Sequence, residues 1–338
     1  MQLAGLPRIA LLGSLLAASA CTSGARGSEL ESTGGYEKLE LRSEGFTGTV
    51  TPAELAEDLG YLAPLRLKYI GSNISGPANI QNVVTGDIDY GGAFNGAIVK
   101  LMAAKAPITA VVGYYGVDSQ IWSGFFVPND SPLRKPADLI GKKVAMNTLG
   151  AHQEFMLKEY LFRNRVAPAS QVTMVVVPPV NGEQALRQGH VEVSVLGSIF
   201  REKALERGGI RPLFSDYELF GAFNAGSYVM RNDFIRKHPK TVRKFVEGVG
   251  RALEWARSTP REEVVARLIS IVERRKRNEN ADAIKYWRSY GVASPEGLLS
   301  DKDFQVWIDW MVREHQLSPG QIRAKDVYTT EFHTAAQR

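Results

Sequence analysis

Residues 69–96 constrain the fold of this chain more than any other stretch. They read YIGSNISGPANIQNVVTGDIDYGGAFNG, which predicts a strand end, a polar loop, a short helix and a second strand over residues 87–90. Pro77 suits the first turn of a helix, and Gly86 suits a left-handed helix end. A second helix is expected to begin at Asn95. Because helix N-termini beside strand ends present free N–H groups, this stretch predicts one wall of a site for a small anion.

The same order of strands and helices recurs further along the chain. Residues 37–122 alternate strand and helix patterns, and residues 137–196 repeat the alternation. This predicts two α/β lobes, each with a mostly parallel sheet covered by helices. A length of 338 residues also exceeds what one hydrophobic core usually organises.

Two apolar runs, residues 122–127 and 225–230, are interpreted as the crossings between the lobes. Beyond residue 230 the pattern is helical, including residues 282–290 and 302–314, and we expect these helices to pack back onto the first lobe. The predicted boundaries are 37–122 with 228–338 for the first lobe and 123–227 for the second.

The N-terminal residues are typical of a targeting segment. Arg8 precedes an apolar run of about ten residues, too short to span a bilayer but suited to a signal peptide. Ala18-Ser19-Ala20-Cys21 resembles the lipobox of bacterial lipoproteins, although leucine is commoner at the position of Ala18. We expect residues 1–21 to be a signal segment, with lipidation of Cys21 or plain secretion, and residues 22–36 to be a flexible tether. Cys21 is the only cysteine, which excludes a disulfide within the chain.

Three groups of motifs resemble those of the solute-binding proteins of nitrate/sulfonate/taurine-type ABC importers. They are Ser75-Gly76-Pro77 with residues 86–91, Asp130-Ser131-Pro132 with residues 137–145, and residues 233–239 with the helix after them. The resemblance covers roughly residues 37–270. It implies a type II periplasmic binding protein fold, in which two doubly wound α/β lobes joined by two crossover strands close on a ligand. It also implies a monomer outside the cytoplasm, periplasmic or membrane-anchored, whose partner is an ABC permease in the inner membrane.

The candidate ligand contacts are small or polar residues beside predicted helix starts, with one loop aromatic. They are Phe46, Ser72, Asn73, Ser75, Gly76 and Asn95 on the first lobe, and Thr148, Gly150, Ala151, His152 and Ser198 on the second. Helix capping is the alternative interpretation of most of them. Phe46 is interpreted as a lid or a packing residue, and His152 as a ligand contact or a cap residue.

The sequence favours a non-catalytic binding protein over an enzyme. It contains no nucleophile elbow, phosphate loop or paired histidines, so neither catalysis nor a metal or other cofactor is expected. Its 41 basic and 36 acidic residues are scattered, which argues against nucleic-acid binding. The expected ligand is a small anionic or polar organic molecule, most of all a sulfonate. Glu192 and residues 196–198 depart from the family's usual Asp and aromatic, so the usual sulfonate contacts do not transfer.

Other interpretations remain open at this point. A thiamine-pyrimidine or aromatic-carboxylate binder would share the fold. A ferric-ion carrier would use the adjacent pair Tyr114 and Tyr115. A pyrimidine-synthase-like enzyme would also share the fold, but that family carries a cysteine-rich motif and this chain has only Cys21.

Overall fold

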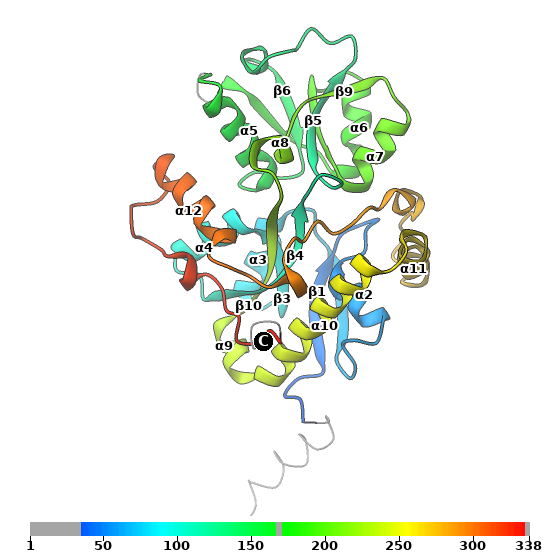
Figure 1. The fold of residues 1–338 in the computed structure, drawn as a ribbon, viewed down its shortest axis with the longest axis vertical. Coiled ribbons are helices and arrows are strands. Elements are labelled where there is room, and N and C mark those ends of the chain that lie inside the picture. Colours follow the sequence, from blue (N-terminus) through cyan, green and yellow to red (C-terminus); the bar gives the residue numbers. More distant parts are fainter. Residues whose placement is uncertain (1–34, 167–170, 335–338) are drawn as a thin grey trace, which may run out of the picture.

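The computed structural model describes residues 35–166 and 171–334. The predicted signal segment, Cys21 and most of the predicted tether lie outside these residues. Figure 1 shows two α/β lobes stacked along the long axis, with both ends of the described chain in the lower one. We call the lower one lobe 1 and the upper one lobe 2. The two-lobed α/β architecture predicted from the sequence is confirmed.

Lobe 1 holds two of the three sheets found in the described residues. In the first, β1 (Glu40–Gly45) pairs in parallel with β2 (Arg66–Ser72). In the second, β10 (Phe223–Arg231) lies between β3 (Tyr90–Phe94) and β4 (Ile108–Val117), antiparallel to both. The expectation of a mostly parallel sheet is wrong here, because the returning chain inserts β10 between two strands that are otherwise parallel.

The helices of lobe 1 follow its strands closely. They are α2 (Pro52–Asp58), α3 (Gly76–Thr85), α4 (Asn95–Ala103) and α9 (Asn232–Lys237). Thr51 and Glu54 form the capping box that the sequence predicts for α2. Gly86 ends α3 with a φ of 85°, as its position predicts.

The strand after α3 begins later than predicted. Residues 87–89 form bends, and β3 begins at Tyr90 with all five of its residues buried. Asp89 is turned instead towards Lys38 and Arg42, which both bind its carboxylate at 2.9 Å. The alternation of apolar and acidic residues over 87–90 therefore predicted the strand in the wrong place. A strand that is covered on both faces has no polar side, so it shows no such alternation.

Lobe 2 is built on one sheet of the order β7-β6-β8-β5-β9. Its strands are β5 (Ser123–Pro128), β6 (Lys143–Met146), β7 (Thr173–Val176), β8 (Val193–Gly197) and β9 (Ile210–Ser215). The first three strands of that order are parallel, and β5 runs antiparallel to its neighbours β8 and β9. The helices are α5 (His152–Arg163), α6 (Pro179–Arg187), α7 (Ser198–Glu206) and α8 (Asp216–Phe220).

The chain passes between the lobes in two short connections, residues 118–122 after β4 and residues 221–222 after α8. The segments expected to cross, 122–127 and 225–230, adjoin these connections and form strands inside the two sheets. The predicted boundary at residue 122 falls directly before β5, whereas the boundary at 227 falls within β10.

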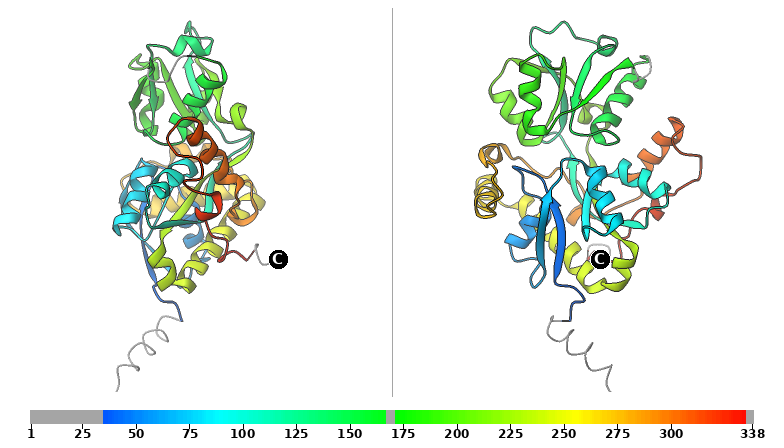
Figure 2. Two further views of the ribbon diagram at one scale, coloured as in Figure 1. Left: turned by 90° about the vertical axis from the view of Figure 1, so that its left-hand side faces the viewer. Right: turned by 180° about the vertical axis from the view of Figure 1, so that it is seen from behind.

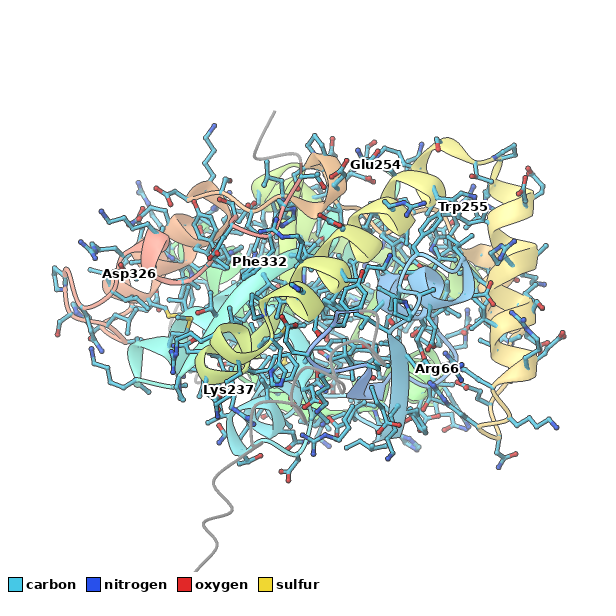
Figure 3. The ribbon with its side chains drawn as sticks, turned by 90° about the horizontal axis from the view of Figure 1, so that it is seen from below. Arg66, Lys237, Glu254, Trp255, Asp326 and Phe332 are labelled. Atoms are coloured by element: carbon cyan, nitrogen blue, oxygen red, sulfur yellow. The ribbon has the colours of Figure 1, made fainter. Side chains whose placement is uncertain are left out.

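The C-terminal segment packs mainly on lobe 1. Figure 3 shows α10 (Pro239–Ser258) crossing the base of the molecule between the labelled Lys237 and Trp255, and α10 contacts α2 and β4. Figures 1 and 2 show α11 (Arg261–Arg274) and α12 (Lys302–Arg313) on opposite flanks of lobe 1. Residues 282–290, predicted as a helix, form a 3-10 helix over Asp282–Tyr286 and then an irregular segment.

Among the described residues, no helix is both long enough and apolar enough to span a bilayer.

Candidate functional site

A cavity of about 490 Å³ lies between the lobes and is lined by residues of both. Lobe 1 contributes the loop after β1, the ends of β3 and β4, and part of the C-terminal segment. Lobe 2 contributes the start of β5, the end of β8 and the first residues of α5, α6 and α7. Within the described chain, no Lys, Arg, Asp or Glu belongs to the lining.

Aromatic side chains dominate the walls of this cavity. They are Phe46, Phe94, Tyr114, Tyr115, Trp122, Phe200, Trp287 and Tyr290. The rings of Tyr114 and Tyr115 meet edge to face at 4.9 Å, and those of Trp287 and Tyr290 at 5.6 Å. Such walls suit the faces and edges of a flat organic molecule.

The two tyrosines at the end of β4 stay protonated. Burial raises the pKa of Tyr114, and burial, Tyr114 and the nearby Asp216 carboxylate together raise the pKa of Tyr115 well above its ordinary value. Tyrosine binds ferric ion as phenolate, so this environment opposes that role. In addition, no three side chains of His, Cys, Asp or Glu gather at one point in the described residues.

Trp287 and Tyr290 reach the cavity because the segment after α11 is fixed at several points. Gly116 donates its backbone N–H to the carbonyl of Tyr290 at 2.9 Å, and the Tyr290 hydroxyl donates to the carbonyl of Val50 at 3.1 Å. The side chain of Arg261 donates to the carbonyl of Trp287 at 2.8 Å. The indole N–H of Trp287 is itself buried and has no hydrogen-bond partner among the described residues.

His152 and Asp216 form a buried pair at the wall contributed by lobe 2. The His152 ring stacks on Phe94 of lobe 1, with centroids 5.0 Å apart and planes 8° apart. Its Nε2 lies 3.2 Å from Oδ2 of Asp216, whose side chain is fully buried. Oδ1 of Asp216 accepts the backbone N–H of Ser123 at 2.9 Å. A carboxylate therefore lies directly behind this wall.

Three helix starts at the cavity, those of α2, α3 and α5, are already contacted by the protein's own side chains. At α2 the capping box places the Glu54 side chain at the helix start. At α3 the Ser75 hydroxyl accepts the N–H of Ala78 at 3.3 Å. At α5 the carboxylate of Glu154 accepts the N–H of Gly150 at 2.7 Å.

The starts of α6 and α7, both in lobe 2, differ in whether they can donate N–H groups. At α6, Pro178 and Pro179 occupy the cap and the first helical position, and neither has an N–H to donate. At α7, Gly197 caps the helix with no side-chain hydrogen bond and no acidic residue follows in the first turn. The start of α7 therefore keeps its N–H groups without an internal side-chain acceptor or a proline, and so does the start of α4, whose cap residue Phe94 also lines the cavity.

Five of the predicted contact residues line the cavity: Phe46, Gly76, Ala151, His152 and Ser198. Three others lie where the two lobes meet or beside that point. The hydroxyls of Ser75 and Thr148 are hydrogen-bonded at 3.0 Å, and the backbone N–H of Gly150 donates to the carboxylate of Glu154. Ligand contact by these residues stays a prediction.

The other three predicted contacts are held inside lobe 1 and lie outside the lining. Ser72 lies 2.9 Å from the hydroxyl of Tyr69, and Asn73 accepts the N–H of Ser75 at 2.9 Å. Asn95 is completely buried, and its amide donates to two carbonyls, those of Asn224 and Asp303, while accepting from Ser227. Ligand contact by these three residues also stays a prediction, although their hydrogen bonds within lobe 1 favour a structural role.

Sequence reasoning missed most of the aromatic wall. Tyr114 and Tyr115 were noticed only as an adjacent pair, and Trp122 only as part of an apolar run. No local sequence pattern points to Trp287 and Tyr290 as cavity residues, because the contacts that position them come from residues far away in the sequence.

The chain matches the family model "NMT1/THI5 like" over residues 49–263. No curated protein matches it. Its fold is similar to the aliphatic sulphonate binding protein SsuA of Escherichia coli, with 20% identity, a TM-score of 0.65 and coverage of 87% of this chain and 92% of that one. It is similar to the nitrate-binding protein NrtA of Synechocystis PCC 6803, with 16% identity, a TM-score of 0.72 and coverage of 89% of each chain.

An enzyme shares the same fold. The desulfurization enzyme DSZB has 16% identity, a TM-score of 0.59 and coverage of 89% of this chain and 99% of that one. These similarities confirm the periplasmic binding protein fold, and the family match spans well over half of the sequence. The chain therefore belongs to the NMT1/THI5-like family.

Proposed function

We propose that this protein is the extracytoplasmic solute-binding component of an ABC importer. It encloses a small organic molecule between its lobes and delivers that molecule to a permease in the inner membrane. The observation that carries this proposal is the cavity of about 490 Å³ with walls from both lobes. A site of this volume fits an organic ligand, and two short connections suit a hinge that opens and closes it. The binding proteins for sulphonate and nitrate named above support the same function.

The protein acts by binding rather than by catalysis in this proposal. His152 and Asp216 lie close together, but the imidazole Nε2 is buried 3.2 Å from the carboxylate. A ligand recovered unchanged after incubation with the protein supports binding. Conversion of a bound compound would overturn this part of the proposal and favour an enzyme, as in the structurally similar desulfurization enzyme.

The main experiment is a thermal-shift screen of the protein without residues 1–21. The panel contains alkyl and aryl sulfonates, nitrate, aromatic carboxylates, pyrimidines and uncharged aromatic compounds. A ligand at a hundred times its Kd stabilises the folded state by about 2.7 kcal/mol, which such a screen resolves. Sulfonates are the class of ligand expected from the sequence, and the panel tests them directly.

A matched pair of variants ties any hit to the cavity. Val180 is exposed and lines the cavity rim, so Val180→Trp should obstruct entry and remove the shift. Val306 is exposed on α12 outside the lining, so Val306→Trp should leave the shift unchanged. Cells that lack the protein should lose uptake of the hit, and wild-type protein but not Val180→Trp should restore it. Uptake that persists without the protein would overturn the role in import.

The membrane anchor is a separate part of the proposal. Lipidation at Cys21 would hold the protein at the membrane through residues 22–36. Cys21→Ser should then move the protein from the membrane fraction to the soluble extracytoplasmic fraction. An unchanged distribution would overturn the anchor but not the binding role. We expect a monomer, which light scattering of the purified protein measures.

A further inference from the structure

We propose that the ligand is an uncharged, planar aromatic molecule with more than one ring. This inference rests on the proposed function, since it takes the cavity between the lobes as the ligand site. It differs from the sulfonate expected from the sequence. The reasons are the charge of the lining, the buried carboxylate of Asp216, the aromatic walls and the unpaired donor of Trp287.

The charge of the lining is the first reason. No Lys, Arg, Asp or Glu of the described chain lines the cavity. Enclosing a charged group without a counter-charge or a set of hydrogen bonds is strongly unfavourable. The one basic side chain in the described lining is His152, and its Nε2 already lies 3.2 Å from the Asp216 carboxylate, so an anionic ligand would depend chiefly on helix N-termini.

Several of those helix N-termini already have acceptors within the protein. Glu54 and Ser75 already accept the hydrogen bonds offered at the starts of α2 and α3. At α5, burial alone would raise the pKa of Glu154, but the N–H of Gly150 and the side chain of Lys158 outweigh burial and lower it. The ionised Glu154 thus lies in the first turn of α5, where its charge opposes a ligand anion. The starts of α4 and α7 still offer N–H groups without a side-chain acceptor, but neither helix start supplies the full positive charge that would offset an enclosed anion.

The buried carboxylate of Asp216 is the second reason. It lies behind the His152 ring and has no solvent exposure. Its negative charge disfavours a phenolate at Tyr115, a residue of the cavity wall. The same field opposes a sulfonate or carboxylate group placed against that wall. An uncharged ligand meets no such repulsion.

The aromatic walls supply the third reason. A volume of about 490 Å³ greatly exceeds what nitrate or a single ring needs. Edge-to-face and stacked contacts with rings are the main attraction that such walls offer. Several of the wall aromatics, among them Tyr115, Trp122 and Trp287, come from different segments of the chain and can contact a ligand of two fused rings together.

One polar group of the wall selects the ligand further. Trp287 is 7% exposed, and its indole N–H is buried without a partner among the described residues. A buried donor that stays unpaired is unfavourable, and we infer that a ligand enclosed against Trp287 pairs with it. The preferred ligand therefore carries a neutral acceptor, such as a carbonyl oxygen or a ring nitrogen.

The test compares two nearly isosteric probes, 2-acetylnaphthalene and 2-naphthoate, by calorimetry with the protein lacking residues 1–21. The first is an uncharged ketone and the second carries a carboxylate of similar shape. We expect 2-acetylnaphthalene to bind at least tenfold more tightly. Tighter binding of 2-naphthoate, or of an alkanesulfonate, would overturn the inference and leave the proposed function standing.

Two variants test the donor and the location. Trp287→Phe keeps a ring but removes the N–H, so it should weaken 2-acetylnaphthalene about three- to tenfold and leave naphthalene unchanged. Equal weakening of both probes would overturn the hydrogen bond to Trp287. Val180→Trp should weaken both probes, because it obstructs the cavity. If no aromatic probe binds, the inference is wrong, and if no compound of the wider panel binds, the proposed function is wrong as well.

Discussion

The hydroxyl of Ser75 in lobe 1 lies 3.0 Å from the hydroxyl of Thr148 in lobe 2. Beside it, the side-chain amide of Asn147 donates to the carbonyl of Ile74 at 3.2 Å. These bonds join the loop after β2 to the loop after β6, so the lobes touch on this side of the cavity. Two residues predicted to face each other across a ligand thus contact each other directly.

The bond between these hydroxyls should favour the closed arrangement of the lobes. Thr148→Val removes the hydroxyl and keeps the shape, and one hydrogen bond is worth about 1 kcal/mol. We expect the ligand-free variant to be more open, with a larger radius of gyration in small-angle X-ray scattering. Ligand affinity should fall up to about fivefold. An unchanged radius of gyration and affinity would contradict this prediction.

Ser75→Ala serves as the comparison, because Ser75 has a second role. Its hydroxyl also caps α3 by accepting the N–H of Ala78. We expect Ser75→Ala to lower the free energy of unfolding by about 1 kcal/mol in addition to opening the lobes. In the double variant with Thr148→Val, the opening effects should not add, because both changes remove the same bond.

Gly226 should be essential for the position of Tyr115 in the cavity wall. A Cβ on Gly226 would lie 2.0 Å from the Tyr115 ring and 2.6 Å from the carbonyl oxygen of Ala93. Gly226→Ala should therefore displace the ring, lower the free energy of unfolding by about 1–3 kcal/mol and weaken the ligand. Calorimetry and denaturant unfolding measure the two effects.

The matched control for this prediction is Gly71→Ala in β2. A Cβ on Gly71 would meet no atom within 4 Å. We expect its stability to change by less than about 0.5 kcal/mol and ligand affinity to stay the same. Equal effects of the two substitutions would show that Gly226 is not required by the packing of Tyr115.

Features of the fold that depend on sequence neighbours were predictable from the sequence. The capping box at Thr51 and Glu54, the αL end of α3 at Gly86 and the start of α4 at Asn95 each involve residues a few positions apart. The insertion of β10 between β3 and β4 was not predictable in this way. It depends on pairing between segments more than a hundred residues apart, such as Ser227 with Ala93.

The residues of the site can be divided in the same way, into those suggested by their sequence neighbours and those placed by distant contacts. Phe46, Gly76 and His152 lie at loop ends and helix starts, where residue type alone suggests exposure to a cleft. Trp287 and Tyr290 lie in a segment whose pattern suggested a helix, and distant backbone and side-chain groups place them at the cavity. The occupation of the helix starts by the protein's own carboxylates also needs three-dimensional contacts to be seen.

Asp89 should make lobe 1 sensitive to acid. Burial alone would raise the pKa of its carboxyl, but hydrogen bonds from Arg42 and Lys38 outweigh burial and lower the pKa below the ordinary 3.8. A depressed pKa in the folded state gives stability that is present above about pH 3.8 and lost as the pH falls through the folded value. Asp89→Asn should cost about 2 kcal/mol at pH 7, because it removes the charge that accepts hydrogen bonds from Lys38 and Arg42, whose side chains are about one third exposed.

Denaturant unfolding at pH 7 and at several acidic pH values checks this prediction. The difference in stability between wild type and Asp89→Asn should shrink as the pH falls below 3.8. Asp326→Asn is the control, because the Asp326 pair with Arg323 is exposed and should contribute little at any pH. A difference for Asp89→Asn that stays constant with pH would contradict the linkage.

The last prediction concerns α12, which packs on α4 of lobe 1 and also holds α5 of lobe 2. Trp310 stacks on Phe155 at 4.3 Å, and Arg313 binds Glu159, a nearly buried carboxylate. Opening of the lobes must break these contacts or carry α12 along. Arg313→Gln should weaken the contact between α12 and α5. It should not leave Glu159 without a cationic partner, because Arg163 also binds Glu159 at 2.6 Å. We expect hydrogen exchange in α12 and α5 to accelerate several-fold and the ligand to dissociate faster. Arg323→Gln, which removes an ion pair confined to one exposed turn, should change neither rate. If Arg313→Gln behaves like that control, α12 moves with one lobe only and plays no part in holding the two together.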